Sequence, residues 1–235
     1  MFSASADYYD LIYSSFKNYA DETSKIAALI REKCPAAKTV LDVGCGTGEH
    51  VRLLTVEHGF AVDGMDLEPK FAAIAAQKNP NGSFHHADMT AFELHKKYDV
   101  VLCLFSSIGY VKSLENVGKT LACFHRHLNP NGIAIVEPWF TPEAWTAGRV
   151  FMKTVEKDGL AICRMGHTTL KGSISELAFE YLIGGPDGIT RQSERHELGL
   201  FTTAEQLHCF RENGFDVTHD EKGLTGRGMF VGKAV

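Results

Sequence analysis

The stretch Thr39 to Gly48 reads T-V-L-D-V-G-C-G-T-G. Its apolar Val40, Leu41 and Val43 predict a short buried strand, and alternating glycines at Gly44, Gly46 and Gly48 follow directly. Glycine adopts positive φ and lets the backbone approach a ligand, while the N–H groups that open the next helix face that ligand. The pattern predicts a nucleotide-like binding turn, although an ordinary strand-to-helix turn has the same appearance.

Composition narrows the class of protein. The 235 residues are 44% hydrophobic and 23% charged, which suits one large domain or one domain with an insertion. The net charge is −5, and the longest basic run is Lys96-Lys97. These features argue against nucleic acid as a bulk electrostatic partner.

Other features of the chain favour a cytoplasmic protein without metal. There is no apolar run long enough to cross a bilayer, and the first ten residues lack a signal peptide's basic start and apolar core. Six scattered cysteines, without a C-x-x-C pair, are expected to be reduced and buried. His85 and His86 are adjacent in an expected strand and point to opposite faces, so we predict no metal site.

Two acidic residues follow the next expected strands. Asp66 lies 22 residues after Gly44, where a carboxylate can accept hydrogen bonds from ribose hydroxyls. Asp88 lies another 22 residues on, and it can accept from an adenine amine while Met89 packs on the ring. Capping of the next helix or turn is the structural alternative for both acids.

Strand and helix patterns alternate through the first 140 residues. We expect helices at 21–34, 70–78 and 113–127, a turn at 129–132, and strands at 40–43, 60–65, 83–86, 98–105 and 132–137. This order predicts a doubly wound α/β sheet with its ligands at the carboxyl ends of the strands. The aromatic lead-in within residues 1–34 either packs on the core or forms a lid.

The pattern changes after residue 140. Alternating segments at 150–155, 161–167, 176–183 and 191–200 are separated by glycine-containing turns and predict an inserted antiparallel meander. A helix at 203–213 and strands at 215–219 and 229–231 return to the first domain. We therefore expect residues 1–140 and 200–235 to form one domain and residues 141–199 to form an inserted subdomain.

Several of these motifs resemble those of a known enzyme family. L-D-V-G-C-G-T-G, Asp66 and Asp88-Met89 resemble class I S-adenosylmethionine-dependent methyltransferases. Nearly the whole chain is similar to the dTDP-3-amino-sugar N,N-dimethyltransferases of antibiotic biosynthesis. That similarity rests on Y-D-L at Tyr9, F-S-S-I-G-Y at Phe105, E-P-W at Glu137, H-E-L-G-L-F-T at His196 and G-R-G-M-F-V-G at Gly226.

The resemblance implies a Rossmann-like seven-stranded sheet, S-adenosylmethionine as cofactor and S-adenosylhomocysteine as product. The insertion is expected to bind the acceptor, to form a homodimer, or both. The resemblance implies cofactor contacts from Tyr9, Tyr19, Gly44, Asp66, Asp88, Met89 and Leu104. Neighbouring positions complete the expected cofactor site: Cys45, Gly46, Gly48 and Leu67.

The acceptor is expected to be a small-molecule amine, such as a dTDP-linked amino sugar. Methyl transfer requires the amine held about 3–3.5 Å from the methyl group, and Tyr110 and Tyr9 are candidates to orient it. Arg227, between two glycines, is a candidate to bind a diphosphate, or else a surface turn residue. Further candidates for acceptor binding are Ser106, Trp139, Lys153, Glu156, Arg164, Met165 and His167.

Alternatives remain open at this point. Another small-molecule amine is the nearest alternative to a nucleotide-linked sugar. An RNA or protein methyltransferase and a non-catalytic S-adenosylmethionine sensor are the other two hypotheses. The sequence does not separate single from double methylation or identify the acceptor.

Overall fold

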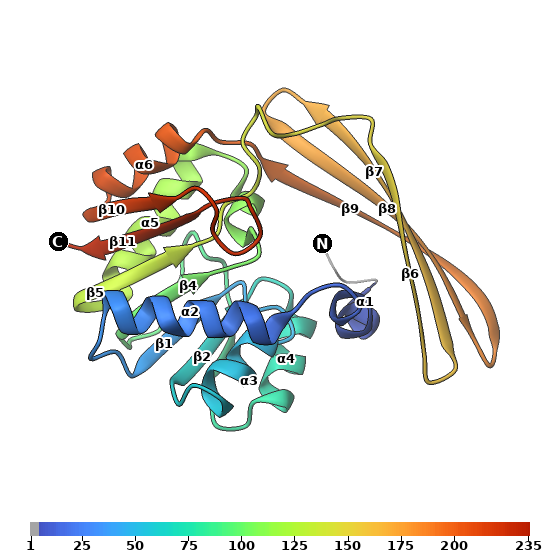
Figure 1. The fold of residues 1–235 in the computed structure, drawn as a ribbon, viewed down its shortest axis with the longest axis horizontal. Coiled ribbons are helices and arrows are strands. Elements are labelled where there is room, and N and C mark those ends of the chain that lie inside the picture. Colours follow the sequence, from blue (N-terminus) through green and yellow to red (C-terminus); the bar gives the residue numbers. More distant parts are fainter. Residues whose placement is uncertain (1–4) are drawn as a thin grey trace.

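The computed structural model describes residues 5–235. Its strands form a seven-stranded sheet of order β10-β11-β5-β4-β1-β2-β3 and a four-stranded sheet of order β6-β7-β8-β9. Figure 1 shows the four-stranded sheet to one side of the seven-stranded sheet, with helix α1 (Tyr9–Ser14) between them. The expectation of a doubly wound sheet with an added antiparallel sheet is confirmed.

The seven-stranded sheet follows the order of the predicted strands. The pairs of β1 with β2 and β4, of β2 with β3, and of β4 with β5 are parallel, whereas β11 is antiparallel to both β5 and β10. Parallel strands buried on both faces require near-continuous apolar runs, which the chain supplies. The strands are β1 (Thr39–Val43), β2 (Ala61–Asp66), β3 (Phe84–His86), β4 (Tyr98–Cys103), β5 (Leu128–Val136), β10 (Phe215–Asp220) and β11 (Met229–Ala234).

Helices cover both faces of this sheet. Side chains of α2 (Tyr19–Lys33), α3 (Glu49–Val56) and α4 (Pro69–Lys78) share one buried cluster with Val40 of β1. Side chains of α5 (Leu114–His127) and α6 (Thr203–Glu212) share the other with Leu41. Side chains of adjacent strand residues therefore pack into the buried clusters on opposite faces of the sheet. Each fully buried Leu or Ile stabilises the fold by about 1.5–3 kcal/mol.

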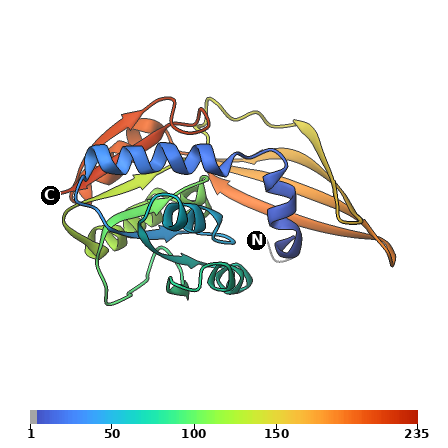
Figure 2. The same cartoon turned by 60° about the horizontal axis from the view of Figure 1, so that its bottom comes forward.

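The four-stranded sheet is a meander of β6 (Val150–Lys157), β7 (Leu160–Lys171), β8 (Ile174–Gly185) and β9 (Gly188–Gly199). Every pairing in it is antiparallel. Its inner face packs on α1 and the 3₁₀ helix η1 (Ala6–Tyr8) in a third buried cluster. Figure 2 shows α1 beside this sheet, while α2 runs along the seven-stranded sheet.

One turn prediction was wrong. Residues 129–132, which read N-P-N-G, lie inside β5. Asn131 has a φ of +64°, and the register between β4 and β5 shifts between Tyr98 and Val100. The turn residues thus produce a bulge in the strand instead of ending it.

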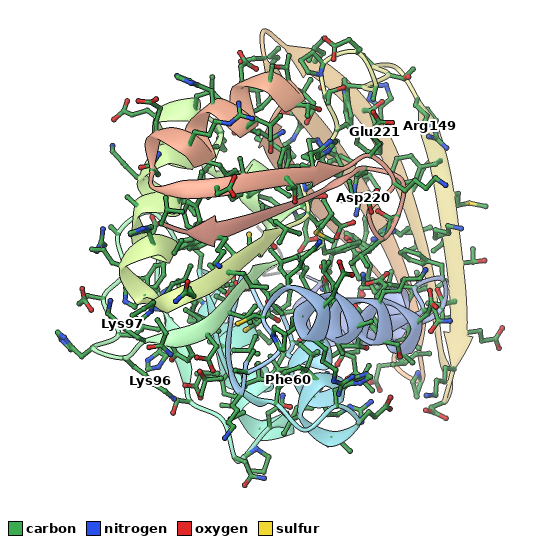
Figure 3. The ribbon with its side chains drawn as sticks, turned by 60° about the vertical axis from the view of Figure 1, so that its left-hand side comes forward. Phe60, Lys96, Lys97, Arg149, Asp220 and Glu221 are labelled. Atoms are coloured by element: carbon green, nitrogen blue, oxygen red, sulfur yellow. The ribbon has the colours of Figure 1, made fainter. Side chains whose placement is uncertain are left out.

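Two features lie away from the facing sheets. The basic pair Lys96 and Lys97 lies at the end of the seven-stranded sheet that is remote from the four-stranded sheet (Figure 3). Lys96 forms an ion pair with Asp63 at 2.6 Å, and Lys97 donates to the Leu128 carbonyl. Within residues 5–235, there is no helix long and apolar enough to cross a membrane.

The carboxyl ends of the parallel strands point toward the four-stranded sheet (Figure 1). The 3₁₀ helix η2 (Ser107–Val111) follows β4 at this edge. The loop between β10 and β11, labelled at Asp220 and Glu221 in Figure 3, reaches the same side. The fold thus gathers the glycine turn, α1, η2 and this loop opposite the inner face of β7 to β9.

Candidate active site

A cavity of about 800 Å³ lies between the two sheets. Its volume is within the range of pockets that bind small molecules and cofactors. The residues that border it come from the glycine turn, α1, η2 and the inner face of the four-stranded sheet. The sequence-predicted residues among them are Tyr9, Tyr19, Gly44, Cys45, Gly46, Asp66, Leu67, Met89, Leu104, Tyr110, Trp139, Arg164 and Arg227.

The glycine turn meets the cavity at its first two glycines. Gly44 has a φ of +75°, and a Cβ there would lie 2.7 Å from the side chain of Ser107. A Cβ at Gly46 would meet no atom within 4 Å, so this peptide is open to a ligand. Gly48 does not border the cavity: its Cβ would lie 2.7 Å from Asn79 Nδ2, so it permits the close approach of α4.

Two carboxylates stand beside this turn. Asp66 accepts the backbone N–H of Gly46 at 2.9 Å with one oxygen and that of Glu68 at 2.8 Å with the other. Each oxygen keeps a further lone pair for a ligand hydroxyl. Asp42, the second-last residue of β1, is 2% exposed, and burial raises its pKa to about 6.

Asp88 and Ser106 do not border the cavity. Asp88 is exposed and accepts from the N–H and hydroxyl of Thr90, both at 2.8 Å, which is the capping alternative. Its neighbour Met89 borders the cavity instead. Ser106 is 1% exposed and donates to the Pro138 carbonyl at 2.7 Å, while Ser107 faces the cavity.

A charged group near the glycine turn was missed by sequence reasoning. Lys17 forms an ion pair with Glu22, whose carboxylate also contacts His50 Nε2 at 3.0 Å. The ammonium of Lys17 lies 4.1 Å from the ring centroid of Phe105. Burial lowers the pKa of Lys17 despite the neighbouring Glu22. A lone lysine before a helix carries no sequence signal that separates it from a solvated one.

Arg164 of β7 is the buried cation on the opposite wall. It is 5% exposed, and its guanidinium lies 5.1 Å from the ring centroid of Tyr13 and 4.8 Å from that of Phe179. Its Nε and Nη1 atoms have no hydrogen-bond partner among residues 5–235. A buried charge with open donors is costly, so this position favours an anionic ligand.

The other candidates on the insertion lie outside the cavity. Met165 and His167 are exposed because strand side chains alternate, and both point away from the face that carries Arg164. Glu156 of β6 is also exposed and does not border the cavity. Lys153 pairs in register with Arg164 but is exposed, and its ammonium lies 5.4 Å from the ring centroid of Phe16.

Arg227 borders the cavity and also holds a buried carboxylate. Its Nη2 donates to Glu137 at 2.8 Å, and Glu137 is fully buried. Glu137 accepts the Thr225 hydroxyl and the Phe105 N–H as well, both at 2.7 Å. The Nε of Arg227 is buried and has no hydrogen-bond partner within residues 5–235.

Trp139 joins the two sheets. Its ring borders the cavity, and its Nε1 donates to Ser175 Oγ of β8 at 2.9 Å. The ring also lies 5.9 Å from the Arg227 guanidinium, measured to its centroid. The aromatic wall is thereby fixed in orientation by a bond to the four-stranded sheet.

Tyr9 and Tyr110 lie in the same buried region, among mutually interacting phenols. Burial, assisted by neighbouring phenols and acids, raises the pKa of both well above 10. Neither phenol can act as a base alone at neutral pH. Tyr110 Oη lies 3.1 Å from His196 Nδ1 of β9. His196 was not among the predicted site residues, although strand alternation could have placed it on the buried face with Glu194.

Comparison with known proteins settles the family. Residues 40–132 match a family model described as a methyltransferase domain. The dTDP-3-amino-3,6-dideoxy-alpha-D-glucopyranose N,N-dimethyltransferase of Streptomyces fradiae is 38% identical, covering 97% of this chain and 89% of that protein. The chain belongs to the amino-sugar N,N-dimethyltransferase family.

Solved structures agree with this assignment. Streptomyces venezuelae DesVI is 37% identical with a TM-score of 0.93, covering 98% of each chain. CalS10, an amino pentose methyltransferase from Micromonospora echinaspora, was solved with S-adenosylmethionine and is 32% identical, with a TM-score of 0.87 and coverage of 97% and 96%. The protein is an S-adenosylmethionine-dependent N-methyltransferase with a Rossmann-like sheet. The open peptide at Gly46 and the carboxylate of Asp66 fit this cofactor.

Proposed function

We propose that this methyltransferase dimethylates the amine of a dTDP-linked amino sugar. The observation that carries the proposal is the buried guanidinium of Arg164, which borders a cavity shared with the glycine turn and whose Nε and Nη1 have no hydrogen-bond partner within residues 5–235. An acceptor that bears a diphosphate would satisfy those donors in a cavity next to the cofactor. The relatives named as dTDP-amino-sugar N,N-dimethyltransferases support the same acceptor class.

The cofactor half of the site is formed by the strand ends. We propose that Gly44 to Gly46 approach the cofactor backbone-first, that Asp66 accepts the ribose hydroxyls, and that Met89 and Leu104 pack on the adenine. Lys17 supplies a cation for the cofactor's carboxylate. When bound, S-adenosylmethionine supplies a methyl group activated by a sulfonium. Asp88, Ser106 and Gly48 have no direct contact in this proposal.

The acceptor half combines Arg164 and Arg227 with an aromatic wall. Both residues border the cavity, and Arg164 Nε and Nη1 and Arg227 Nε have no hydrogen-bond partner within residues 5–235. Bidentate guanidinium donors match phosphate oxygens better than an ammonium does. Trp139, whose ring centroid lies 5.9 Å from the Arg227 guanidinium, forms a flat wall for the acceptor.

The reaction requires positioning above all. Tyr9 and Tyr110 would hold the amine so that its lone pair points at the methyl group, at about 3–3.5 Å. Tyr9 is only 8% exposed, so the reacting region is closed to bulk water from that side. On this view residues 1–140 and 200–235 hold the cofactor, and residues 141–199 hold the acceptor.

The first 34 residues connect the two halves. Asp10 accepts the Thr47 hydroxyl at 2.5 Å and the Lys78 ammonium at 2.7 Å, which ties α1 to the glycine turn and α4. Tyr9 and Tyr13 of α1 line the cavity. We propose that this segment covers the bound ligands as a lid. Residues 1–4 of the expected lid lie outside the described part of the chain.

The outer face of the four-stranded sheet supports a homodimer in this proposal. It exposes apolar side chains on all its strands: Val150, Met152, Met165, Leu182 and Ile189. Exposed apolar residues that cluster on one face are typical of interfaces. Light scattering coupled to size-exclusion chromatography tests the dimer. The six cysteines are all free thiols, which supports the proposed cytoplasmic location.

The test of function is methyl transfer itself. The purified enzyme is incubated with S-adenosylmethionine and either a dTDP-linked amino sugar or the same sugar without its nucleotide. We expect mass spectrometry to show one and then two added methyl groups on the nucleotide-linked sugar, with little reaction on the free sugar. Equal reaction with both sugars would contradict recognition of the nucleotide, and no reaction with either would contradict the acceptor class.

A further inference from the structure

A buried row of side chains leads away from the reacting region. Tyr110 Oη lies 3.1 Å from His196 Nδ1, and His196 Nε2 lies 3.4 Å from Glu194 Oε2. The side chains of His196 and Glu194 are 1% and 2% exposed. Tyr110 and His196 both border the cavity, whereas Glu194 lies behind them. The row therefore runs from the cavity surface to a carboxylate in the core.

The surroundings of Glu194 fix its charge. It accepts the N–H and hydroxyl of Ser5 at 2.8 and 2.9 Å and the phenol of Tyr181 at 3.0 Å. Burial would raise its pKa, but hydrogen bonds from His196, Ser5 and Tyr181 outweigh burial and hold the pKa below its usual range. Glu194 is therefore a carboxylate, and a carboxylate only accepts hydrogen bonds.

The charge of Glu194 in turn selects the tautomer of His196. A carboxylate repels an imidazole lone pair, so Glu194 favours the neutral tautomer with its proton on Nε2 and a lone pair on Nδ1. Tyr110 then donates its hydroxyl proton to Nδ1. The phenol oxygen keeps lone pairs that can accept a hydrogen bond from a group in the cavity.

Other charged and titratable groups reach this region from each neighbouring element. Tyr13 on α1, Tyr181 on β8 and Asp66 after β2 interact electrostatically with Tyr110. Arg164 on β7 interacts with Tyr13 and Tyr181. Arg164 adds a positive charge to this region, and Glu194, 3.4 Å from His196 Nε2, adds a negative one.

We propose that Tyr110, His196 and Glu194 form a proton relay that removes a proton from the acceptor's ammonium group before each methyl transfer. This role rests on the proposed function, since it requires an amine acceptor. The ammonium N–H proton passes to Tyr110 Oη while the hydroxyl proton of Tyr110 passes to His196 Nδ1. The ammonium becomes a neutral amine with a free lone pair, the phenol stays neutral, and His196 becomes an imidazolium paired with Glu194.

The relay meets a requirement that Tyr110 cannot meet alone. A sugar amine is mostly protonated at neutral pH, because ammonium pKa values are about 8–10. The pKa of Tyr110 is raised by burial, so a phenolate would not form to take this proton. Double methylation requires a second deprotonation, because the monomethylated product is again an ammonium. His196 returns its proton to solvent between the two transfers.

The test is the pH dependence of His196→Ala. We expect kcat/KM for the acceptor to fall about 100-fold at pH 7, within the range of general base catalysis. At about pH 10, where the amine is already neutral, the loss should shrink to about fivefold or less. Binding of S-adenosylhomocysteine, measured by calorimetry, should stay within about twofold and shows that the variant is folded.

Two further variants separate the relay from packing. Glu194→Gln keeps the shape but removes the charge, so we expect a loss of about tenfold at pH 7 that also shrinks at high pH. Tyr181→Phe removes a hydroxyl that donates to the same carboxylate oxygen but does not belong to the row. It should keep the wild-type pH profile and a kcat/KM within about threefold.

The outcomes are distinguishable. If wild-type enzyme methylates the amine and His196→Ala loses the same factor at every pH, the relay is wrong and the proposed function stands. The same conclusion follows if His196→Ala fails to fold and Glu194→Gln shows a loss independent of pH. If wild-type enzyme methylates no amino sugar, the proposed function fails and the relay falls with it.

Discussion

The two walls of the cavity present different buried charged groups. The carboxyl edge of the seven-stranded sheet presents Asp42 and Asp66 beside the glycine turn, whereas the inner face of the four-stranded sheet presents the buried Arg164. The cofactor bears a sulfonium, and a nucleotide-linked acceptor bears a diphosphate. Each wall therefore matches a charge on one proposed ligand. We expect the reaction to take place where the two walls meet.

Glu137 lies where the two walls meet, so its loss is the largest effect we expect. It is fully buried and accepts from Phe105, Thr225 and Arg227. Breaking a buried ion pair by removing one partner leaves an uncompensated charge. Glu137→Ala should lower the free energy of unfolding by about 3–5 kcal/mol, measured by urea denaturation.

The double variant is the control for this pair. Glu137→Ala with Arg227→Met removes the stranded guanidinium, so it should be more stable than Glu137→Ala alone. If Glu137→Ala lowered the free energy of unfolding by less than about 1 kcal/mol, the ion pair of Glu137 with Arg227 would be as weak as a surface pair. That result would contradict its role in joining the two walls.

The buried carboxylate of Asp42 should make the free energy of unfolding depend on pH. Burial raises the pKa of Asp42 to about 6 from 3.8, so ionised Asp42 disfavours folding above pH 6 and has no effect below pH 4. Asp42→Asn should therefore stabilise the ligand-free protein by about 2–3 kcal/mol at pH 7.5 and by little at pH 4.

Asp63 offers a matched comparison of opposite sign. It lies away from the cavity, and although burial raises its pKa, hydrogen bonds from Lys96, Ser83 and Tyr98 outweigh burial and lower it. Asp63→Asn should destabilise the protein at pH 7.5, and that loss should disappear as the pH falls through the range in which Asp63 is protonated. If both variants changed the free energy of unfolding in the same direction at pH 7.5, the destabilising effect assigned to ionised Asp42 would be wrong.

The smallest effect is expected on the outer face of the four-stranded sheet. Met165 is 48% exposed and adjacent in sequence to Arg164, but it points to the other side. Met165→Ser should change kcat/KM by less than about twofold and stability by less than about 0.5 kcal/mol. A large rise in the acceptor KM would show that the acceptor also contacts the outer face.

The fold could be predicted because its signals are local. Near-continuous apolar strands, the glycine turn and the helix periodicity between them specify a parallel sheet within each stretch of about 30 residues. The proposed cofactor residues follow from the same logic, since Asp66 ends β2, Gly44 directly follows β1 and Met89 lies shortly after β3. The turn expected at 129–132 is instead a bulge inside β5, because Leu128 pairs with Tyr98 and Ile133 pairs with Val100 on either side of it.

The acceptor wall was harder to predict because it depends on long-range placement. Alternation divides β7 into two faces, but the sequence does not say which face meets the cavity, so Arg164 and Met165 were equal candidates. Lys17 contacts Phe105, and His196 contacts Tyr110 of η2, and both partners are far away in the chain. The hydroxyl of Ser106 donates a hydrogen bond to the Pro138 carbonyl, and no local sequence pattern predicts this contact.

Calorimetry tests whether the two walls of the cavity bind different ligands. Wild type, Asp66→Ala and Arg164→Met are each titrated with S-adenosylhomocysteine and with dTDP. Arg164→Met keeps an apolar stem against Tyr13 and Phe179 but removes the charge. We predict that Asp66→Ala weakens only S-adenosylhomocysteine binding and Arg164→Met only dTDP binding, each by about 1.5–3 kcal/mol. Equal losses for both ligands in either variant, or no loss of dTDP binding in Arg164→Met, would contradict separate ligand binding by the two walls.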